Sequence, residues 1–126
     1  DHRRLETYGL QAVLSGEQIL AIQRACVGVI VEPSIVKYIT SIVGKTRNWA
    51  TIEVGASPRA GVCLLLASRA MAVCRGRNFV TPDDVKQLAP WVLRHRLRLH
   101  PEAEIEGTSL ETVIQDVLDA VEAPQP

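Results

Sequence analysis

The sequence predicts an all-α fold, a compact helical bundle of about five helices. Hydrophobic residues make up 47% of the chain but aromatic residues only 4%, so the core must be built from aliphatic side chains. Apolar positions recur at helical spacing in separate segments, each opened by a capping residue or a proline. At 126 residues the chain has the usual size of one domain with one core.

The first two helices are predicted from their start signals. Ser15 and Gln18 match a capping box, and apolar residues at helical spacing carry this helix to about Cys26. Residues 27–31 form a short apolar stretch broken by a glycine, which we expect to be an extended connector. Pro33 then opens a second, amphipathic helix from its first-turn position.

The third helix is expected to lie at the centre of the bundle. A loop over residues 48–56 ends in Ser57 and Pro58, an N-cap followed by a proline at the first helical position. Residues 62–74 are apolar on nearly every side, which predicts a helix surrounded by neighbours. Gly76 is placed to cap its C-terminus.

Two further helices complete the predicted bundle. Thr81, followed by a proline and the carboxylates of Asp83 and Asp84, is the strongest helix start in the chain. Residues 97–107 are expected to be extended, and the last helix is expected to begin at Thr108. Its apolar stripe consists of Val113, Ile114, Val117, Leu118 and Val121.

The net charge is zero, but the charges are unevenly distributed. Residues 1–100 carry all 14 Lys and Arg with half of the acids, whereas residues 101–126 carry seven acids and no base. This division fits either a nucleic-acid surface with its own mask or a terminal helix docked on a basic body. The docked helix is the simpler interpretation.

Membrane, secretory and metal-binding classes are not expected. No apolar run approaches the roughly 18 residues of a membrane span, and the first six residues are mostly charged where a secretory signal would turn apolar. Cys26, Cys63 and Cys74 fall at apolar helical positions without metal-ligand spacing, which favours inert core thiols. The sequence therefore predicts a soluble, cytoplasmic protein with no metal site.

No catalytic residues are predicted within this chain. The tripeptide from Gly44 to Thr46 ends like a phosphate-binding loop, but Ile39 stands where the first glycine of that motif belongs. The tripeptide also ends an amphipathic helix, whereas the motif needs a flexible loop between a strand and a helix. No Ser, His and acid set stands out, and His95, between two arginines, is expected on a solvated face.

Arg59 is the most informative polar residue. It would occupy the second position of its helix, where the dipole is positive and a cation is mildly unfavourable. One interpretation is an anion held by the free N–H groups and the guanidinium together. The other is a surface arginine that points away from the dipole or pairs with Glu53. Helix physics alone leaves both open.

Several sequence runs, taken in order, resemble the lid of MoxR-family AAA+ ATPases. They are Gly-Ala-Ser-Pro-Arg-Ala at 55–60, Leu-Leu-Ala-Ser-Arg-Ala at 65–70, Gly-Arg-Asn-Phe-Val-Thr-Pro-Asp-Asp-Val at 76–85 and Val-Leu-Arg-His-Arg-Leu at 92–97. Tyr38-Ile39, Thr46-Arg47 and Glu106-Gly107 also look like that family, so the resemblance covers residues 13–122.

The resemblance implies the domain organisation and the site residues. Residues 1–14 would be a linker from an AAA+ core that this sequence lacks, and residues 15–126 the helical lid with its C-terminal helix. Arg59 would be the sensor 2 arginine, which reaches the γ-phosphate of ATP bound on the core. Gly55, Ala56, Ser57 and Pro58 would form the supporting loop and helix N-terminus.

The resemblance also implies function and partners. The chain would be a nucleotide-sensing lid that couples ATP binding and hydrolysis on the core to ring movements and chaperone-like remodelling. The full-length parent would use ATP and Mg as an ATPase, whereas this fragment alone would need no cofactor and would not be an enzyme. Its partners would be its own core, neighbouring ring subunits and proteins with von Willebrand factor A domains, with no membrane partner.

A histone-like helical DNA-binding module is the alternative function. Residues 76–85 resemble a histone-fold loop and helix start, and the body of the chain is basic. Zero net charge, few aromatic residues and the lack of a basic stripe along one helix argue against nucleic acid as a partner.

Overall fold

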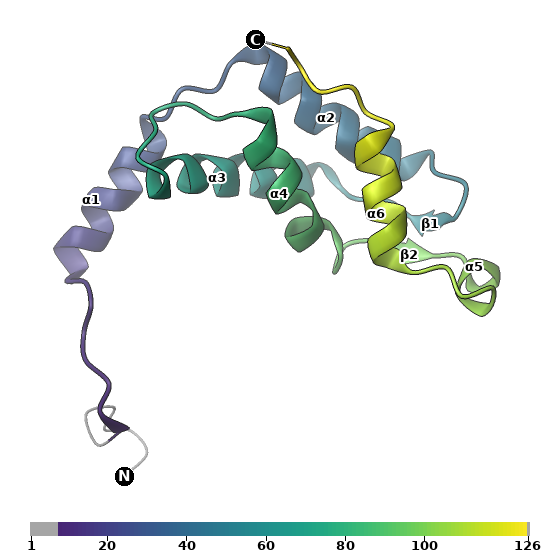
Figure 1. The fold of residues 1–126 in the computed structure, drawn as a ribbon, viewed down its shortest axis with the longest axis horizontal. Coiled ribbons are helices and arrows are strands. Elements are labelled where there is room, and N and C mark those ends of the chain that lie inside the picture. Colours follow the sequence, from purple (N-terminus) through teal and green to yellow (C-terminus); the bar gives the residue numbers. More distant parts are fainter. Residues whose placement is uncertain (1–7, 126) are drawn as a thin grey trace.

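The computed structural model describes residues 8–125 and shows a helical bundle (Figure 1), as the sequence predicts. In chain order, the described elements are α1 (Gly16–Val27), α2 (Pro33–Arg47), β1 (Ile52–Val54), α3 (Pro58–Cys74), α4 (Pro82–Leu93), β2 (Arg98–Leu99), α5 (Pro101–Ile105) and α6 (Leu110–Asp119). Residues 1–7 of the expected linker lie outside the described part of the chain. No helix within the described part is long and apolar enough to cross a membrane.

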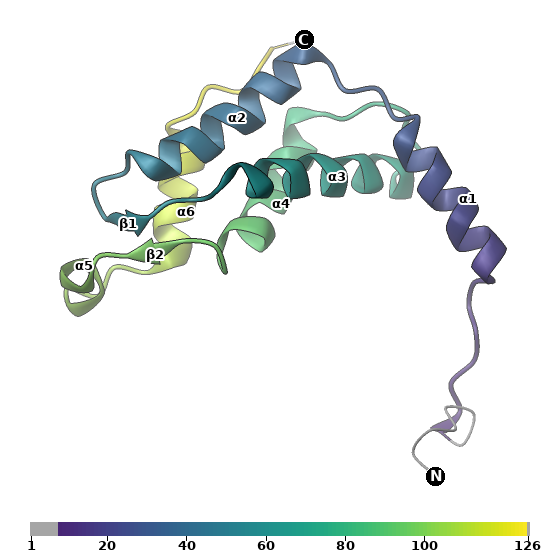
Figure 2. The same ribbon diagram turned by 180° about the vertical axis from the view of Figure 1, so that it is seen from behind.

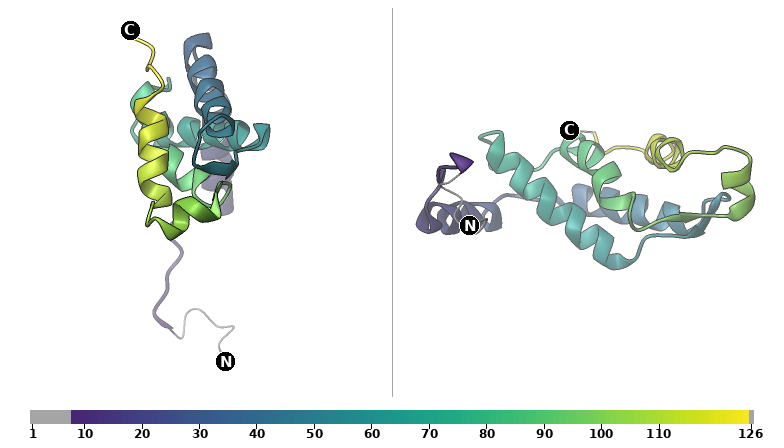
Figure 3. Two further views of the ribbon diagram at one scale, coloured as in Figure 1. Left: turned by 90° about the vertical axis from the view of Figure 1, so that its right-hand side faces the viewer. Right: turned by 90° about the horizontal axis from the view of Figure 1, so that it is seen from below.

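Helix α3 is the element on which the bundle is assembled. It packs against α1, α2 and α4, while α6 packs against α2 and α4 (Figure 2). α1 lies at one end of the molecule, as Figure 1 and the right-hand view of Figure 3 show. None of the residues of α1 is buried, so the core is supplied by Val29 in the connector and by the chain from α2 onward.

The N-terminal boundaries follow the predicted signals. Ser15 and Gln18 form the expected capping box, with N–H to side-chain oxygen distances of 2.8 and 3.2 Å. α1 runs one residue further than expected, to Val27, and Pro33 opens α2. The connector between them is held by a parallel bridge in which Ile30 N–H donates to the Asn78 carbonyl at 2.8 Å.

Helix α3 is buried on one face only, which corrects the prediction that neighbours surround it. Its buried residues, Ala60, Leu64, Ser68 and Ala72, recur every four positions and form a single stripe. Val62 and Leu66 are each 56% exposed. A run that is apolar all round cannot specify which face is covered, and here α1, α2 and α4 leave the opposite face open.

Gly76 caps the C-terminus of α3, as predicted. This glycine has φ of +68°, and its N–H donates to the Val73 carbonyl at 2.9 Å. The next N–H, from Arg77, donates to the Ala72 carbonyl at 2.8 Å. These two bonds are a Schellman cap, which needs the left-handed conformation that glycine adopts without strain.

Three short elements fall where the sequence predicts none. Residues 48–56 contain β1 rather than loop alone, and residues 97–107 contain β2 and α5 rather than an extended segment. Ile52 and Leu99 pair in the antiparallel β1–β2 ladder. Elements this short show no hydrophobic periodicity of their own. The pairing of β1 with β2 also joins residues far apart in the chain.

The acidic C-terminal segment docks on the bundle through α6. Val113, Ile114, Val117 and Leu118 are buried, and Arg94 Nε lies 3.2 Å from Glu111 Oε1. The N-cap is Ser109, whose hydroxyl accepts the Thr112 N–H at 3.1 Å, so the helix starts later than the predicted Thr108.

The cysteines are less buried than expected. Cys26 and Cys63 are half-buried, and Cys74 is exposed at the end of α3 instead of lying in the core. All three are free thiols. No group of residues in the described part of the chain has the composition and geometry of a metal site.

Replacing Ile114 tests whether α6 belongs to the core. Ile114 is 1% exposed, so Ile114→Ala leaves a cavity and should lower the free energy of unfolding by about 3 kcal/mol. Gln115→Ala changes the exposed neighbour and should shift it by less than about 0.5 kcal/mol. Urea unfolding of both variants checks this, and equal small losses would show that α6 is detached in solution.

Candidate functional site

The candidate site lies where the loop after β1 returns to the end of α2 and enters α3. Thr46, in the last turn of α2, is fully buried, and its hydroxyl donates to the Val43 carbonyl at 2.7 Å. The same hydroxyl accepts the Ala56 N–H at 3.0 Å, and Arg47 Nε donates to the Ala56 carbonyl at 2.7 Å. Both backbone polar groups of Ala56 are therefore bonded to side chains at the end of α2.

Gly55 allows this close approach. A Cβ at this position would lie 2.7 Å from Arg47 Cα and 2.9 Å from Arg47 N, far inside normal contact distance. Gly55 is not among the glycines with positive φ, so proximity to α2, rather than backbone conformation, requires glycine here. We call the contacts of Thr46 and Arg47 with Gly55 and Ala56 the α2–α3 junction.

Beyond the junction, α3 begins as the sequence predicts. Ser57 is the N-cap in extended conformation and Pro58 occupies the first turn, but the Ser57 side chain makes no capping hydrogen bond. Arg59 is exposed. Among residues 8–125 it forms no ion pair, and Glu53 pairs instead with Arg98 Nε at 2.8 Å. The interpretation of Arg59 as a partner of Glu53 is therefore wrong.

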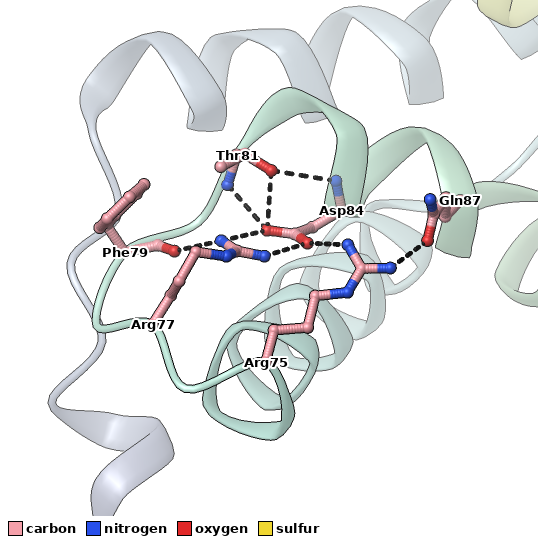
Figure 4. Close-up of polar contacts among 6 residues, drawn as sticks. All are labelled: Arg75, Arg77, Phe79, Thr81, Asp84 and Gln87. Carbon is pink, nitrogen blue, oxygen red and sulfur yellow. Dashed lines mark hydrogen bonds and ion pairs between the residues drawn. The ribbon is translucent and has the colours of Figure 1, made fainter.

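A second polar cluster joins the end of α3 to the start of α4 (Figure 4). The Asp84 side chain is 0% exposed and lies 2.9 Å from Arg75 Nη1 and 2.6 Å from Arg77 Nη2. Thr81 donates its N–H and its hydroxyl to Asp84 Oδ2 at 2.9 and 3.0 Å, and Asp84 N–H returns a bond to the Thr81 hydroxyl. The predicted start of α4 therefore also contains a buried carboxylate that is paired with two arginines.

The environment of Asp84 keeps it ionised. Burial by itself would raise the pKa of Asp84, but hydrogen bonds from Arg77 and Thr81 outweigh that effect and hold it below its ordinary value of 3.8. The same hydrogen bond raises the pKa of Arg77. Two arginines of the basic body are therefore bound to a carboxylate, which weakens the histone-like interpretation of residues 76–85.

The remaining residues that the sequence analysis weighed as site candidates do not form a site. Gly44, Lys45 and Thr46 all lie inside α2, so the tripeptide is not a phosphate-binding loop. Lys45 is exposed, and the Thr46 hydroxyl is used within the junction. His95 is exposed next to Arg96, as expected for a solvated face.

An apolar groove runs between α2 and α3 beside the junction. It has a volume of about 320 Å³. Its lining residues are mostly aliphatic, with Thr40 and Arg47 as polar members, and include Val36, Val43, Val62 and Leu65. The groove offers no set of groups for acid–base or nucleophilic chemistry.

Comparison with known proteins assigns this fold. The family model described as AAA lid domain matches residues 44–117. The chain is 39% identical over 115 residues to the uncharacterized protein YeaC of Bacillus subtilis strain 168, covering 91% of this chain and 36% of YeaC. It is 36% identical over 124 residues to Chaperone MoxR1 of Mycobacterium tuberculosis, covering 90% of this chain and 32% of that protein.

A solved structure gives the same result. The crystal structure of a protein described as an ATPase from Cytophaga hutchinsonii superposes with a TM-score of 0.86 at 32% identity, covering 98% of this chain and 41% of the other. The chain therefore belongs to the AAA lid domain family. Its relatives make it the lid region of a MoxR-type AAA+ ATPase, and it spans about a third of the length of the curated relatives it matches.

The buried ion pair predicts a pH dependence of stability. Because the pKa of Asp84 is lowered in the folded state, its contribution is fully present above about pH 4 and is lost as the pH falls through the folded-state pKa. Asp84→Asn should lower the free energy of unfolding by about 2 kcal/mol at pH 7, since the arginines can partly turn to solvent. The difference from the parent chain should shrink below pH 4.

The exposed neighbour Asp83 provides the control, since it also lies in the first turn of α4 but forms no ion pair within residues 8–125. Asp83→Asn should cost only a few tenths of a kcal/mol. Denaturant unfolding between pH 3 and 7 measures both variants. A loss for Asp84→Asn that stays constant down to pH 3 would contradict an ionised Asp84.

Proposed function

We propose that this chain is the nucleotide-sensing lid of a MoxR-type AAA+ ATPase, with Arg59 as the sensor. The observation that carries the proposal is that the Arg59 side chain is exposed and has no ion-pair partner among residues 8–125. Arg59 stands at the start of α3, directly after a backbone segment held by the α2–α3 junction. A cation kept at the positive end of a helix without a carboxylate is suited to meet an anion.

The residues at this helix start fit a phosphate group. The Ser57 hydroxyl is not used as a cap, the helix presents its positive end, and a guanidinium offers a planar fork of donors. In the full-length protein, Arg59 would contact the terminal phosphate of ATP, and Gly55, Ala56, Ser57 and Pro58 would set its position. The core would hold the nucleotide with Mg, which neutralises phosphate charge during hydrolysis.

A single contact of this kind is sufficient for sensing. If Arg59 binds a terminal phosphate present in ATP and absent from ADP, the lid has different affinities for the two states of the core. That difference shifts the lid as a body. In this proposal residues 15–126 form the lid, residues 1–14 link it to the core, and neighbouring subunits of a ring receive the movement.

The relatives support a remodelling role for the whole protein. One relative is named as a chaperone, and the chain covers only part of it. We propose chaperone-like remodelling of protein complexes, with von Willebrand factor A domain proteins as partners. The free cysteines fit a reducing compartment such as the cytoplasm. No observation favours the histone-like alternative.

Replacing Arg59 in the full-length protein tests the sensing role. Arg59→Ala should lower ATP turnover about tenfold or more, because it removes a donor aimed at phosphate charge. Its melting temperature should stay the same, because an exposed side chain at a helix start adds little to the core. Arg59→Lys should rescue poorly, since an ammonium lacks the planar fork.

Lys45→Ala is the matched control, because Lys45 is also an exposed cation and lies in the last turn of α2, next to the α2–α3 junction. It should leave ATP turnover unchanged. Lost stability with normal turnover in Arg59→Ala would make Arg59 a structural residue and would remove the main support for a sensing lid.

The isolated chain should not hydrolyse ATP. Residues 8–125 show no phosphate-binding loop and no group of acids that could hold a metal ion, both of which phosphoryl transfer needs. Phosphate release by the purified chain should equal the buffer blank. Turnover above the blank that Lys45→Ala abolishes would show that the Gly44–Thr46 tripeptide acts as a nucleotide site after all.

A further inference from the structure

We propose that Thr46 and Arg47 are positioning residues for Arg59. The α2–α3 junction fixes the backbone three residues before Arg59, so that α3 starts at one place and in one direction. This inference rests on the proposed function, because Arg59 must act on a nucleotide for its position to matter. It assigns a role to two residues that make no contact with Arg59 among the hydrogen bonds and ion pairs of the described residues.

The hydrogen bonds of the junction converge on one peptide segment. The Thr46 hydroxyl acts both as donor and as acceptor, since it donates to the Val43 carbonyl and accepts the Ala56 N–H, both within 3.0 Å. Ala56 is 1% exposed, so its N–H and carbonyl have little access to water in place of these partners. Breaking either bond would leave a buried polar group without a partner, which strongly disfavours movement of the loop away from α2.

Steric fit restricts the segment from the other side. Gly55 already sits so close that an added Cβ would lie within 3.0 Å of the Arg47 backbone. The loop therefore cannot move toward α2, and the two hydrogen bonds prevent it from moving away. Together these contacts define the point at which α3 begins.

The hydrogen bonding of the two guanidinium groups distinguishes the role of Arg47 from that of Arg59. Arg47 Nε is bonded to the Ala56 carbonyl at 2.7 Å, so its donor is directed at the protein backbone. Arg59 has no such bond among the described residues and can turn toward a ligand. A displacement of about 1 Å in a catalytic group can cost about a hundredfold in rate, so control of the α3 start has a measurable effect.

The test is a double-mutant cycle in the full-length protein. Thr46→Val keeps the shape of the side chain and removes the hydroxyl, and Thr46→Ser keeps the hydroxyl. Each is made alone and together with Arg59→Ala, and kcat and KM for ATP are measured. Thr46→Val alone should lower kcat about tenfold, and Thr46→Ser should restore most of it. In the Arg59→Ala background, Thr46→Val should cause no further loss, because the residue acts through Arg59.

Arg47 supplies a second pair of variants, at a side chain that is itself exposed. Arg47→Lys keeps the charge but loses the Nε donor, so it should lower kcat as much as Arg47→Ala. If Arg47 instead contacted the nucleotide through its charge, Arg47→Lys would retain much of the activity, and the inference would be wrong. These variants also give an answer if Thr46→Val does not fold.

The outcomes separate this inference from the proposed function. Equal losses from Thr46→Val in both backgrounds would show that Thr46 acts independently of Arg59, which overturns the inference and leaves the sensing role intact. Normal kcat in Thr46→Val and Arg47→Lys also overturns it. Normal turnover in Arg59→Ala refutes the sensing role itself, and the positioning role with it.

Discussion

The rest of the bundle depends on how α3 is held at its two ends. α1, α2 and α4 all pack against this helix, so any change in its position moves its neighbours. Each end is fixed by a buried polar group: the Thr46 hydroxyl at the start and the Asp84 carboxylate at the finish. Buried polar groups are costly unless they are satisfied, so these contacts tolerate few alternative geometries. Aliphatic packing alone would permit more sliding.

The elements that the sequence predicts correctly are those with local signals. The Ser15 capping box, the Thr81 N-cap and the prolines at helix starts each act within four residues, and each appears in the structure. β1, β2 and α5 are not predicted because they span only two to five residues, and the two strands also depend on pairing between residues almost fifty positions apart. The buried face of α3 was missed for a related reason, since its uniformly apolar sequence does not specify its neighbours.

The candidate site was predictable in part. Its unfavourable position at the positive end of a helix singles out Arg59, the family resemblance adds the sensing role, and the Ser-Pro pair places it correctly at a helix start. The sequence assigns no role to Thr46 and Arg47, because their bonds to Ala56 span ten and nine positions and a backbone carbonyl partner leaves no side-chain pattern. The sequence relates the two acids in the first turn of α4 to the helix dipole alone. The arginines at 75 and 77 were the available signal that Asp84 would be paired and buried.

The arrangement of the two polar clusters determines how a movement would spread through the lid. Because they lie at opposite ends of α3, they join α2 to α3 and α3 to α4 without a free hinge between them. α6 then packs across α2 and α4 and closes the same unit. In the proposed function, a force on Arg59 would act on this whole unit, so a phosphate contact at one helix start could reorient the lid as a rigid body. α1 has no buried residues, but it packs against α3 and a bridge at Ile30 holds its connector, so it is attached to the same unit at one end.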